Sequence, residues 1–263
     1  MNNNHRQEYH RAWSRLTPPL RPHPEVVAAV RNQIVGRRGR TLLLGVTPEL
    51  ADVAPDLIAV DRNLSMVKNI WPGNTSARRV IVGDWRNLTF APRSFASCIG
   101  DGSLCGLRHP DEMKAVLAQV AGSLEDSGRF VCRLYVPPAS PETVSAIKDA
   151  VLSGGIQNFH AFKFRLGMAL SAQAAASSIG VAAILIEFNR LFGDRSELVR
   201  STGWDRQEVD TIDFYEASNV HFYFPGEDQV LSVASKIFRS VRLIPTGTYE
   251  MASLCPLLVA ETS

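Results

Sequence analysis

Three acidic residues follow short apolar segments of the chain, and their spacing is typical of a nucleotide-binding site. Asp61 ends one such segment, and Asp84 and Asp101 follow the next two. An earlier apolar segment, residues 42–44, ends in Gly45, 16 positions before Asp61. A fixed carboxylate can accept both hydroxyl hydrogens of a ribose diol, and a second can accept from the amino group of adenine. A β-α-β unit places such an acid at the end of its second strand.

The apolar segments before these residues predict a parallel β-sheet. Each segment is short and continuous, as is typical of a strand buried on both faces. We expect strands at residues 42–44, 57–61, 80–82, 95–99 and 129–136, with helices at 25–33, 64–70 and from Pro110 onward. Ligands of such sheets bind beyond the carboxyl ends of the strands. One cleft should therefore receive Gly45, Asp61, Gly83, Asp84, Trp85, Gly100, Asp101 and Gly102.

The chain before the first strand predicts an arm that reaches this cleft. Residues 1–12 are polar, and residues 13–24 contain four prolines, which favour an extended path. Residues 1–33 are therefore interpreted as an N-terminal arm and helix. Trp13 and Arg21 are candidates to contact a bound ligand, and packing of Trp13 against the protein is an equal alternative.

After the fifth expected strand the alternation of strands and helices stops. Residues 139–224 have a mostly helical pattern and are interpreted as a helical insertion that covers the cleft. The core then comprises residues 34–138 and 225–263, ending in a helix at 227–238 and strands at 240–245 and 255–261. The uncharged stretch 166–186 is long enough to span a bilayer, but it is rich in Ala and Ser. We expect it to form a buried helix or helix pair.

Composition narrows the possible partners. The chain has 263 residues, with 28 Lys and Arg against 26 Asp and Glu, so no strong field attracts nucleic acid or a membrane surface. The four cysteines form no C-x-x-C pair, and neither they nor the six histidines cluster at metal-ligand spacing. The polar start lacks the apolar stretch of a secretion signal. We expect a cytoplasmic monomer or homodimer with buried, reduced cysteines and no metal site.

These motifs together resemble the class I S-adenosylmethionine-dependent methyltransferases, over residues 13–138 and 225–263. The resemblance implies a seven-stranded, mostly parallel Rossmann-like sheet with helices on both faces and an antiparallel last strand. It also implies S-adenosylmethionine as cofactor and S-adenosylhomocysteine as product. The resemblance implies a set of cofactor contacts, which includes Arg62 because it lies beside the second-strand acid. These contacts are Gly45, Val46, Thr47, Asp61, Arg62, Met66, Gly83, Asp84, Trp85, Gly100, Asp101 and Gly102. In the family, the loop after the first strand wraps the methionine part of the cofactor, and Asp61 would hold the ribose. Met66, Asp84 and Trp85 would contact the adenine.

The glycine loop departs from the family pattern. The family loop usually has two or three glycines, as in G-x-G-x-G, and here Val46 and Pro48 replace positions where the backbone usually approaches the cofactor. Glu49 is either a replacement cofactor contact or a solvated loop acid. The departure favours a non-catalytic binding or regulatory protein as the alternative to methyl transfer. A dinucleotide-dependent oxidoreductase is a further alternative, against which the absence of G-x-G-x-x-G after the first strand counts.

The leading hypothesis is methyl transfer to a small organic acceptor in a pocket under residues 139–222. Asp101, His109, His160 and Tyr215 are the candidate catalytic residues. Each also has a structural interpretation: Asp101-Gly102 is a common turn pair, and His109 precedes a proline where a helix cap is favoured. His160 and Tyr215 are favoured as parts of buried packing faces rather than as an acceptor pocket.

Overall fold

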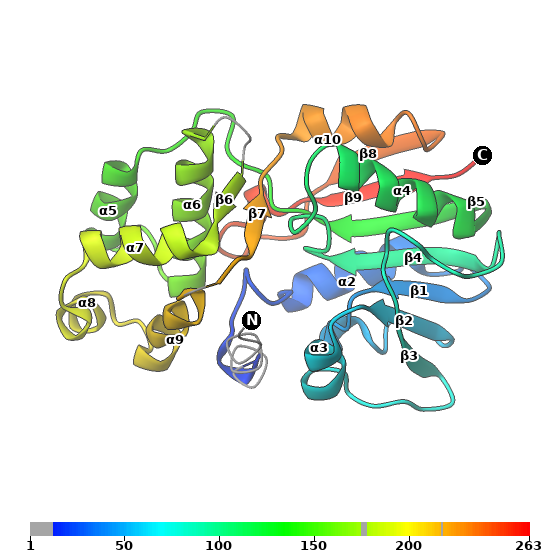
Figure 1. Ribbon diagram of the computed structural model, residues 1–263, viewed down its shortest axis with the longest axis horizontal. Helices are drawn as coiled ribbons and strands as arrows, with labels where there is room; N and C mark the ends of the chain where they lie inside the picture. The colour runs from blue at the N-terminus through cyan, green and yellow to red at the C-terminus, as the bar shows by residue number, and fades with distance from the viewer. Residues whose placement is uncertain (1–12, 175–177, 217) are drawn as a thin grey trace.

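A seven-stranded mixed sheet forms the centre of the protein (Figure 1). We describe it from a computed structural model, which covers residues 13–174, 178–216 and 218–263. The strand order is β3-β2-β1-β4-β5-β9-β8, and β9 runs antiparallel to both of its neighbours while the others run parallel to one another. This confirms the predicted fold class. The strands are β1 (Thr41–Leu44), β2 (Leu57–Asp61), β3 (Arg78–Val82), β4 (Phe95–Asp101), β5 (Leu124–Arg133), β8 (Ser240–Ile244) and β9 (Leu257–Glu261).

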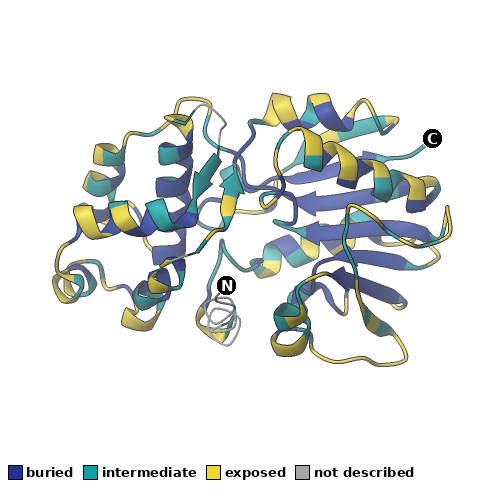
Figure 2. Cartoon of the chain, viewed as in Figure 1, coloured by how far each residue is buried: buried dark blue, intermediate teal, exposed yellow. Residues whose placement is uncertain are grey.

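Helices cover both faces of the sheet, as predicted. On one face α2 (Pro24–Ile34) and α3 (Leu64–Asn69) pack over Leu43, and on the other α4 (Asp111–Ser123) and α10 (Glu227–Ala234) pack over Leu42 and Leu44. Successive residues of β1 point to opposite faces, so each needs an apolar side chain. All four residues of β1 are buried, which explains its continuous apolar sequence (Figure 2).

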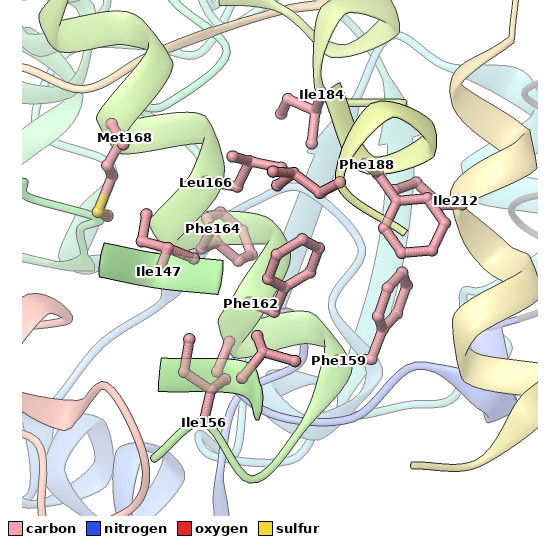
Figure 3. Close-up of a cluster of buried hydrophobic side chains, with 14 of the residues drawn as sticks. Ile147, Ile156, Phe159, Phe162, Phe164, Leu166, Met168, Ile184, Phe188 and Ile212 are labelled. Atoms are coloured by element: carbon pink, nitrogen blue, oxygen red, sulfur yellow. The ribbon is translucent and has the colours of Figure 1, made fainter. Parts of the chain in front are cut away.

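A helical segment follows β5 and lies beyond the carboxyl ends of β4 and β5 (Figure 1). Its helices are α5 (Val144–Leu152), α6 (Phe159–Ala172), α7 (Val181–Leu191), α8 (Arg195–Thr202) and α9 (Arg206–Asp210), followed by the 3-10 helix η3 (Thr211–Tyr215). Aromatic rings from α6 and α7, including Phe159, Phe162 and Phe188, form the core of this segment (Figure 3). The predicted domain boundaries at 138 and 224 stay a prediction.

Four details of the predicted elements were wrong. The third strand is a sheet edge rather than a buried strand, because β3 pairs only with β2, and Ile81 and Val82 are exposed. The strand β6 (Ser178–Gly180), which pairs with β7 (His221–Tyr223), was not foreseen. Strand β5 begins five residues earlier than predicted, and α10 ends at Ala234 rather than at 238.

The uncharged stretch at 166–186 contributes to two helices, α6 and α7, in agreement with the expected helix pair. Among the described residues, no helix has the length and apolar character needed to cross a membrane. The predicted frayed segment, residues 1–12, lies outside the described residues.

Candidate functional site

Residues from the ends of the first three strands meet at one point beyond the sheet. Gly45 has φ of 102°, and a Cβ placed on it would lie 3.8 Å from Cζ2 of Trp85 and 4.0 Å from Oδ2 of Asp61. The backbone N–H of Gly45 and the indole N–H of Trp85 both donate to the carbonyl of Val60, at 2.9 and 2.6 Å. Glycine at this position keeps the space between the carboxylate and the indole open.

Asp61 is held by the chain that follows it. Its Oδ1 accepts from the backbone N–H of Asn63 at 2.7 Å, and Asn63 in turn caps α3. Burial raises the pKa of the Asp61 carboxyl, while the N–H of Asn63 and the charge of Arg62 oppose the rise. The side chain is 7% exposed, with Oδ2 next to Gly45. A buried carboxylate with one oxygen occupied and the other facing a glycine suits the ribose hydroxyls of a nucleoside.

Asp84 lies in an exposed ion-pair network. Nη2 of Arg86 is 2.6 Å and Nη1 of Arg62 is 3.4 Å from Oδ2 of Asp84, and Arg86 also pairs with Glu112 at 3.0 Å. The hydrogen bonds from Arg86 lower the pKa of the Asp84 carboxyl, so it remains charged. Arg62, one of the predicted cofactor contacts, thus forms a hydrogen bond with a carboxylate of the protein itself. Arg86 and Arg62 together fill the roughly four acceptor positions of this carboxylate. An adenine amino group would therefore have to replace one of these donors, and the contact from Arg62, at 3.4 Å, is the longest of them.

Asp101 is part of a buried polar network that sequence reasoning missed. Arg133, the last residue of β5, is fully buried and donates from Nε and Nη2 to the two carboxylate oxygens of Asp101, at 2.6 and 3.0 Å. Its Nη2 also donates to the hydroxyl of Tyr135 at 2.7 Å. The signal that could have revealed it is an arginine inside an otherwise apolar strand, which needs a buried partner. This pairing makes Asp101 a structural acid rather than a free base.

Gly102 is required by the same network. Its φ is 61°, and a Cβ there would lie 2.7 Å from Cε2 of Tyr135. Gly100, its neighbour in the predicted motif, would place a Cβ 2.8 Å from Oγ of Ser103. Both glycines thus allow close packing within the protein, which accounts for them without any ligand.

The unusual loop after β1 buries the side chain of Val46. Val46 is fully buried and belongs to the apolar cluster beneath α2, together with Val26 and Leu50. Thr47 is also buried, and Pro48 then begins the 3-10 helix η2 (Pro48–Leu50). The non-glycine side chain at position 46 therefore packs inward, where it adds core contacts instead of blocking the backbone.

The N-terminal arm reaches this loop through Arg21, and the expected contact of Trp13 and Arg21 with a bound ligand stays a prediction. Nε of Arg21 donates to Oε1 of Glu49 at 2.6 Å, and its Nη2 forms an ion pair with the same oxygen. The Arg21 guanidinium carbon lies 5.6 Å from the centre of the Trp13 ring. The hydroxyl of Tyr135 donates to the carbonyl of Pro19 at 2.8 Å, which fixes the arm to the end of the sheet.

The other candidates lie elsewhere. His109 does not cap α4, so that expectation was wrong: Pro110 occupies the cap position without a side-chain bond. His160 and Tyr215 are buried in the helical segment, where the charge of Lys163 acts on His160 and its ammonium lies 5.1 Å from the Tyr215 ring. Their packing role is thereby confirmed. Met66, in α3, packs against the apolar cluster beneath α2.

Comparisons with solved structures identify this fold. No protein-family model and no curated protein sequence matches the chain. An S-adenosylmethionine-dependent methyltransferase from Methanosarcina mazei superposes with a TM-score of 0.53 at 12% identity, over 92% of this chain and 98% of that one. A protein from Pyrococcus horikoshii OT3 gives 0.55 at 16% identity, over 97% and 99%. An S-adenosylmethionine-dependent methyltransferase from Mesorhizobium loti gives 0.51 at 14% identity, over 89% and 96%.

The chain therefore has the Rossmann-like fold of the class I S-adenosylmethionine-dependent methyltransferases. Since sequence identities this low establish the fold alone, the activity has to be argued from the residues of the cleft.

Proposed function

We propose that this protein binds S-adenosylmethionine and transfers its methyl group to a small organic acceptor, with S-adenosylhomocysteine as product. The observation that carries the proposal is the meeting of Gly45, Asp61 and Trp85 at the carboxyl edge of the sheet. The carboxylate of Asp61 has Oδ1 bonded within the protein and Oδ2 beside Gly45, and the indole of Trp85 lies close by. This arrangement suits a ribose and its adjoining base. The fold supports the same reading, because its matched structures include two named methyltransferases.

The residues of the cleft have separable roles in this proposal. Oδ2 of Asp61 accepts from the ribose hydroxyls, Trp85 offers an apolar face, and Asp84 accepts from the adenine amino group. The cofactor supplies an activated methyl group on a sulfonium. The helical segment beyond β4 and β5, with the arm, shields the site from water and forms the acceptor pocket. Holding the reactants in contact in a dry site is the protein's main contribution to such a displacement.

The first test is titration calorimetry with S-adenosylmethionine and S-adenosylhomocysteine, with NAD as the control. We expect micromolar binding of both sulfur compounds and none of NAD. Asp61→Ala should weaken binding by about 2 kcal/mol, or roughly thirtyfold, because a charged hydrogen-bond acceptor is lost. Binding of NAD alone would favour the oxidoreductase instead, and unchanged affinity in Asp61→Ala would remove Asp61 from the site.

Turnover separates methyl transfer from the non-catalytic alternative. Small amines, alcohols, carboxylic acids and thiols should be screened for acceptor-dependent formation of S-adenosylhomocysteine, with Asp61→Ala as the matched negative control. Cofactor binding with no turnover of any acceptor would favour a binding or regulatory protein. A small-molecule acceptor is consistent with the near-neutral charge, 28 basic against 26 acidic residues, which argues against nucleic acid. The cytoplasmic location and the monomer or homodimer stay predictions.

A further inference from the structure

The two carboxylate oxygens of Glu49 have different environments. Oε1 accepts a hydrogen bond from Nε of Arg21 and forms an ion pair with its Nη2. Oε2 is buried and has no hydrogen-bond partner among the residues that the structure describes, although the Glu49 side chain as a whole is 18% exposed. A buried carboxylate oxygen without a donor is unfavourable by an amount comparable to a lost hydrogen bond. Such an oxygen is suited to a donor that arrives with a ligand.

The position of Glu49 indicates which part of a ligand this would be. Glu49 lies in η2, four residues after Gly45, in the loop between β1 and β2. Its charge is close enough to Asp101 to help raise the pKa of that carboxyl, which burial raises first and Arg133 lowers. Glu49 is therefore near the ends of both β1 and β4. Strand β1 itself, Thr41–Leu44, contributes only threonine and leucine and no acid.

The charge of Asp101 is neutralised more fully than that of Glu49. Both oxygens of Asp101 are bonded to the fully buried Arg133. Arg21 contacts only one oxygen of Glu49 and is itself 28% exposed. A cation that enters between η2 and the end of β4 would thus find its open acceptor at Oε2 of Glu49.

We propose that Oε2 of Glu49 accepts a hydrogen bond from the α-ammonium group of the methionine part of the cofactor, while Arg21 orients the carboxylate through Oε1. This inference rests on the proposed function, because it assigns a recognition residue for the same cofactor. It gives the loop that departs from the family pattern a specific role: its acid recognises the charged amino-acid end of the ligand. Glu49 is then what distinguishes S-adenosylmethionine from adenosine compounds without that end.

Three ligands test the assignment by calorimetry on the full chain. S-adenosylhomocysteine carries the ammonium and carboxylate, its deaminated analogue 5′-deoxy-5′-(3-carboxypropylthio)adenosine keeps only the carboxylate, and 5′-methylthioadenosine has neither. In the unaltered protein the deaminated analogue should bind about 10- to 100-fold more weakly than S-adenosylhomocysteine, as expected for one charge-assisted hydrogen bond. This comparison needs no substitution, so it holds even if a variant fails to fold.

The substitution Glu49→Gln should reduce this discrimination to less than threefold and leave the affinity for 5′-methylthioadenosine unchanged. Glu142→Gln is the matched control, because Glu142 forms a similar partly buried pair with Arg165, Nε to Oε2 at 2.9 Å, before α5. It should retain full discrimination. Arg21→Gln separates the direct contact from the arm. Its ratio of affinities for S-adenosylhomocysteine and the deaminated analogue should be at least the square root of the ratio in the unaltered protein.

The outcomes distinguish the two proposals. If no adenosine compound binds the unaltered protein, the proposed function fails and this inference fails with it. If S-adenosylhomocysteine and its deaminated analogue bind equally well, or if Glu49→Gln weakens all three ligands alike, the ammonium contact is refuted while cofactor binding stands. If Arg21→Gln removes the discrimination as fully as Glu49→Gln does, the arm rather than Glu49 recognises the ammonium.

Discussion

A lysine buried in the helical segment provides a test of the fold that is independent of any ligand. Lys163 is 2% exposed, and its Nζ lies 5.4 Å from the centre of the Phe159 ring and 3.4 Å from Oγ1 of Thr211. Burial lowers the pKa of Lys163 from 10.5 to about 7, and the charge of Glu208 only partly opposes this. The lysine is thus more easily charged in the unfolded chain than in the folded protein.

The direction of the pH dependence follows from this difference. Above about pH 10.5 the lysine is neutral in both states and costs nothing. As the pH falls from 10.5 to about 7, the unfolded chain binds the proton first, so the folded protein loses stability. Below about pH 7 the loss is complete, at about 5 kcal/mol for the shift in the pKa of Lys163. Between pH 9.5 and pH 6.5 the expected loss is about 3 kcal/mol.

The substitution Lys163→Met removes this titration and keeps an unbranched side chain of similar length. We expect the free energy of unfolding of Lys163→Met, relative to the unaltered protein, to rise by about 3 kcal/mol between pH 9.5 and pH 6.5. Urea denaturation followed by circular dichroism at both pH values measures the difference. Packing changes are largely independent of pH, so they cancel in this comparison.

The control is Lys114→Met, since Lys114 is an exposed lysine on α4. It should show a difference from the unaltered protein of less than 0.5 kcal/mol at each pH, as is usual for surface substitutions. The carboxylate of Glu208 and the ring of His160 interact with Lys163, so Glu208→Gln and His160→Gln should be measured beside it. A pH-independent gain in Lys163→Met would refute the argument, because it would mean that the lysine keeps its charge when buried.

Three further substitutions test the site and the cores by urea denaturation. Asp101→Ala should destabilise the protein by about 3–5 kcal/mol, because it leaves the guanidinium of Arg133 buried and unpaired; a loss below 1 kcal/mol would mean that water reaches Arg133. Phe162→Ala should cost about 3–5 kcal/mol, because the ring is fully buried among the aromatic rings of α6 and α7. Val46→Gly should cost about 2 kcal/mol and leave the calorimetric affinity for S-adenosylhomocysteine within twofold, since Val46 packs into the core; a clear gain in affinity would show that its side chain obstructs the cleft.

The sheet was predictable because burial on both faces imposes a distinct sequence pattern. The strands β1, β2 and β4 were all found from their mostly apolar sequences: β1 is followed by Gly45, and β2 and β4 end in Asp61 and Asp101. The edge strand β3 was found as well, but its burial was overestimated, since Val80, Ile81 and Val82 form an apolar run although only one side of the strand is paired. An apolar run reveals that a segment is a strand, but not where the strand lies in the sheet.

The three-residue strand β6 was harder to predict. Strand β6 is Ser178-Ile-Gly180, too short for any alternation to appear, and it exists because it pairs with residues more than 40 positions later. Long-range pairing of this kind leaves no local signal. The buried pair of Asp101 and Arg133 is intermediate: the arginine within an apolar strand signals that a buried partner exists, but only the pairing of β4 with β5 identifies that partner as Asp101.

The loop after β1 illustrates the same limit at the site itself. Compared position by position with the family pattern, Val46 and Pro48 look like lost glycines and favour a protein that has lost its cofactor. In the folded chain the side chain at 46 points into the core, and the following helical turn places Glu49 between the arm and the end of β4. What matters for a ligand is which side chains lie at the strand ends: Asp61 lies beside Gly45 there, and Oε2 of Glu49 is buried without a hydrogen-bond partner among the described residues. The departure from the glycine pattern is therefore weak evidence for lost function, and in the proposal above an acidic side chain of this loop, Glu49, contacts the cofactor.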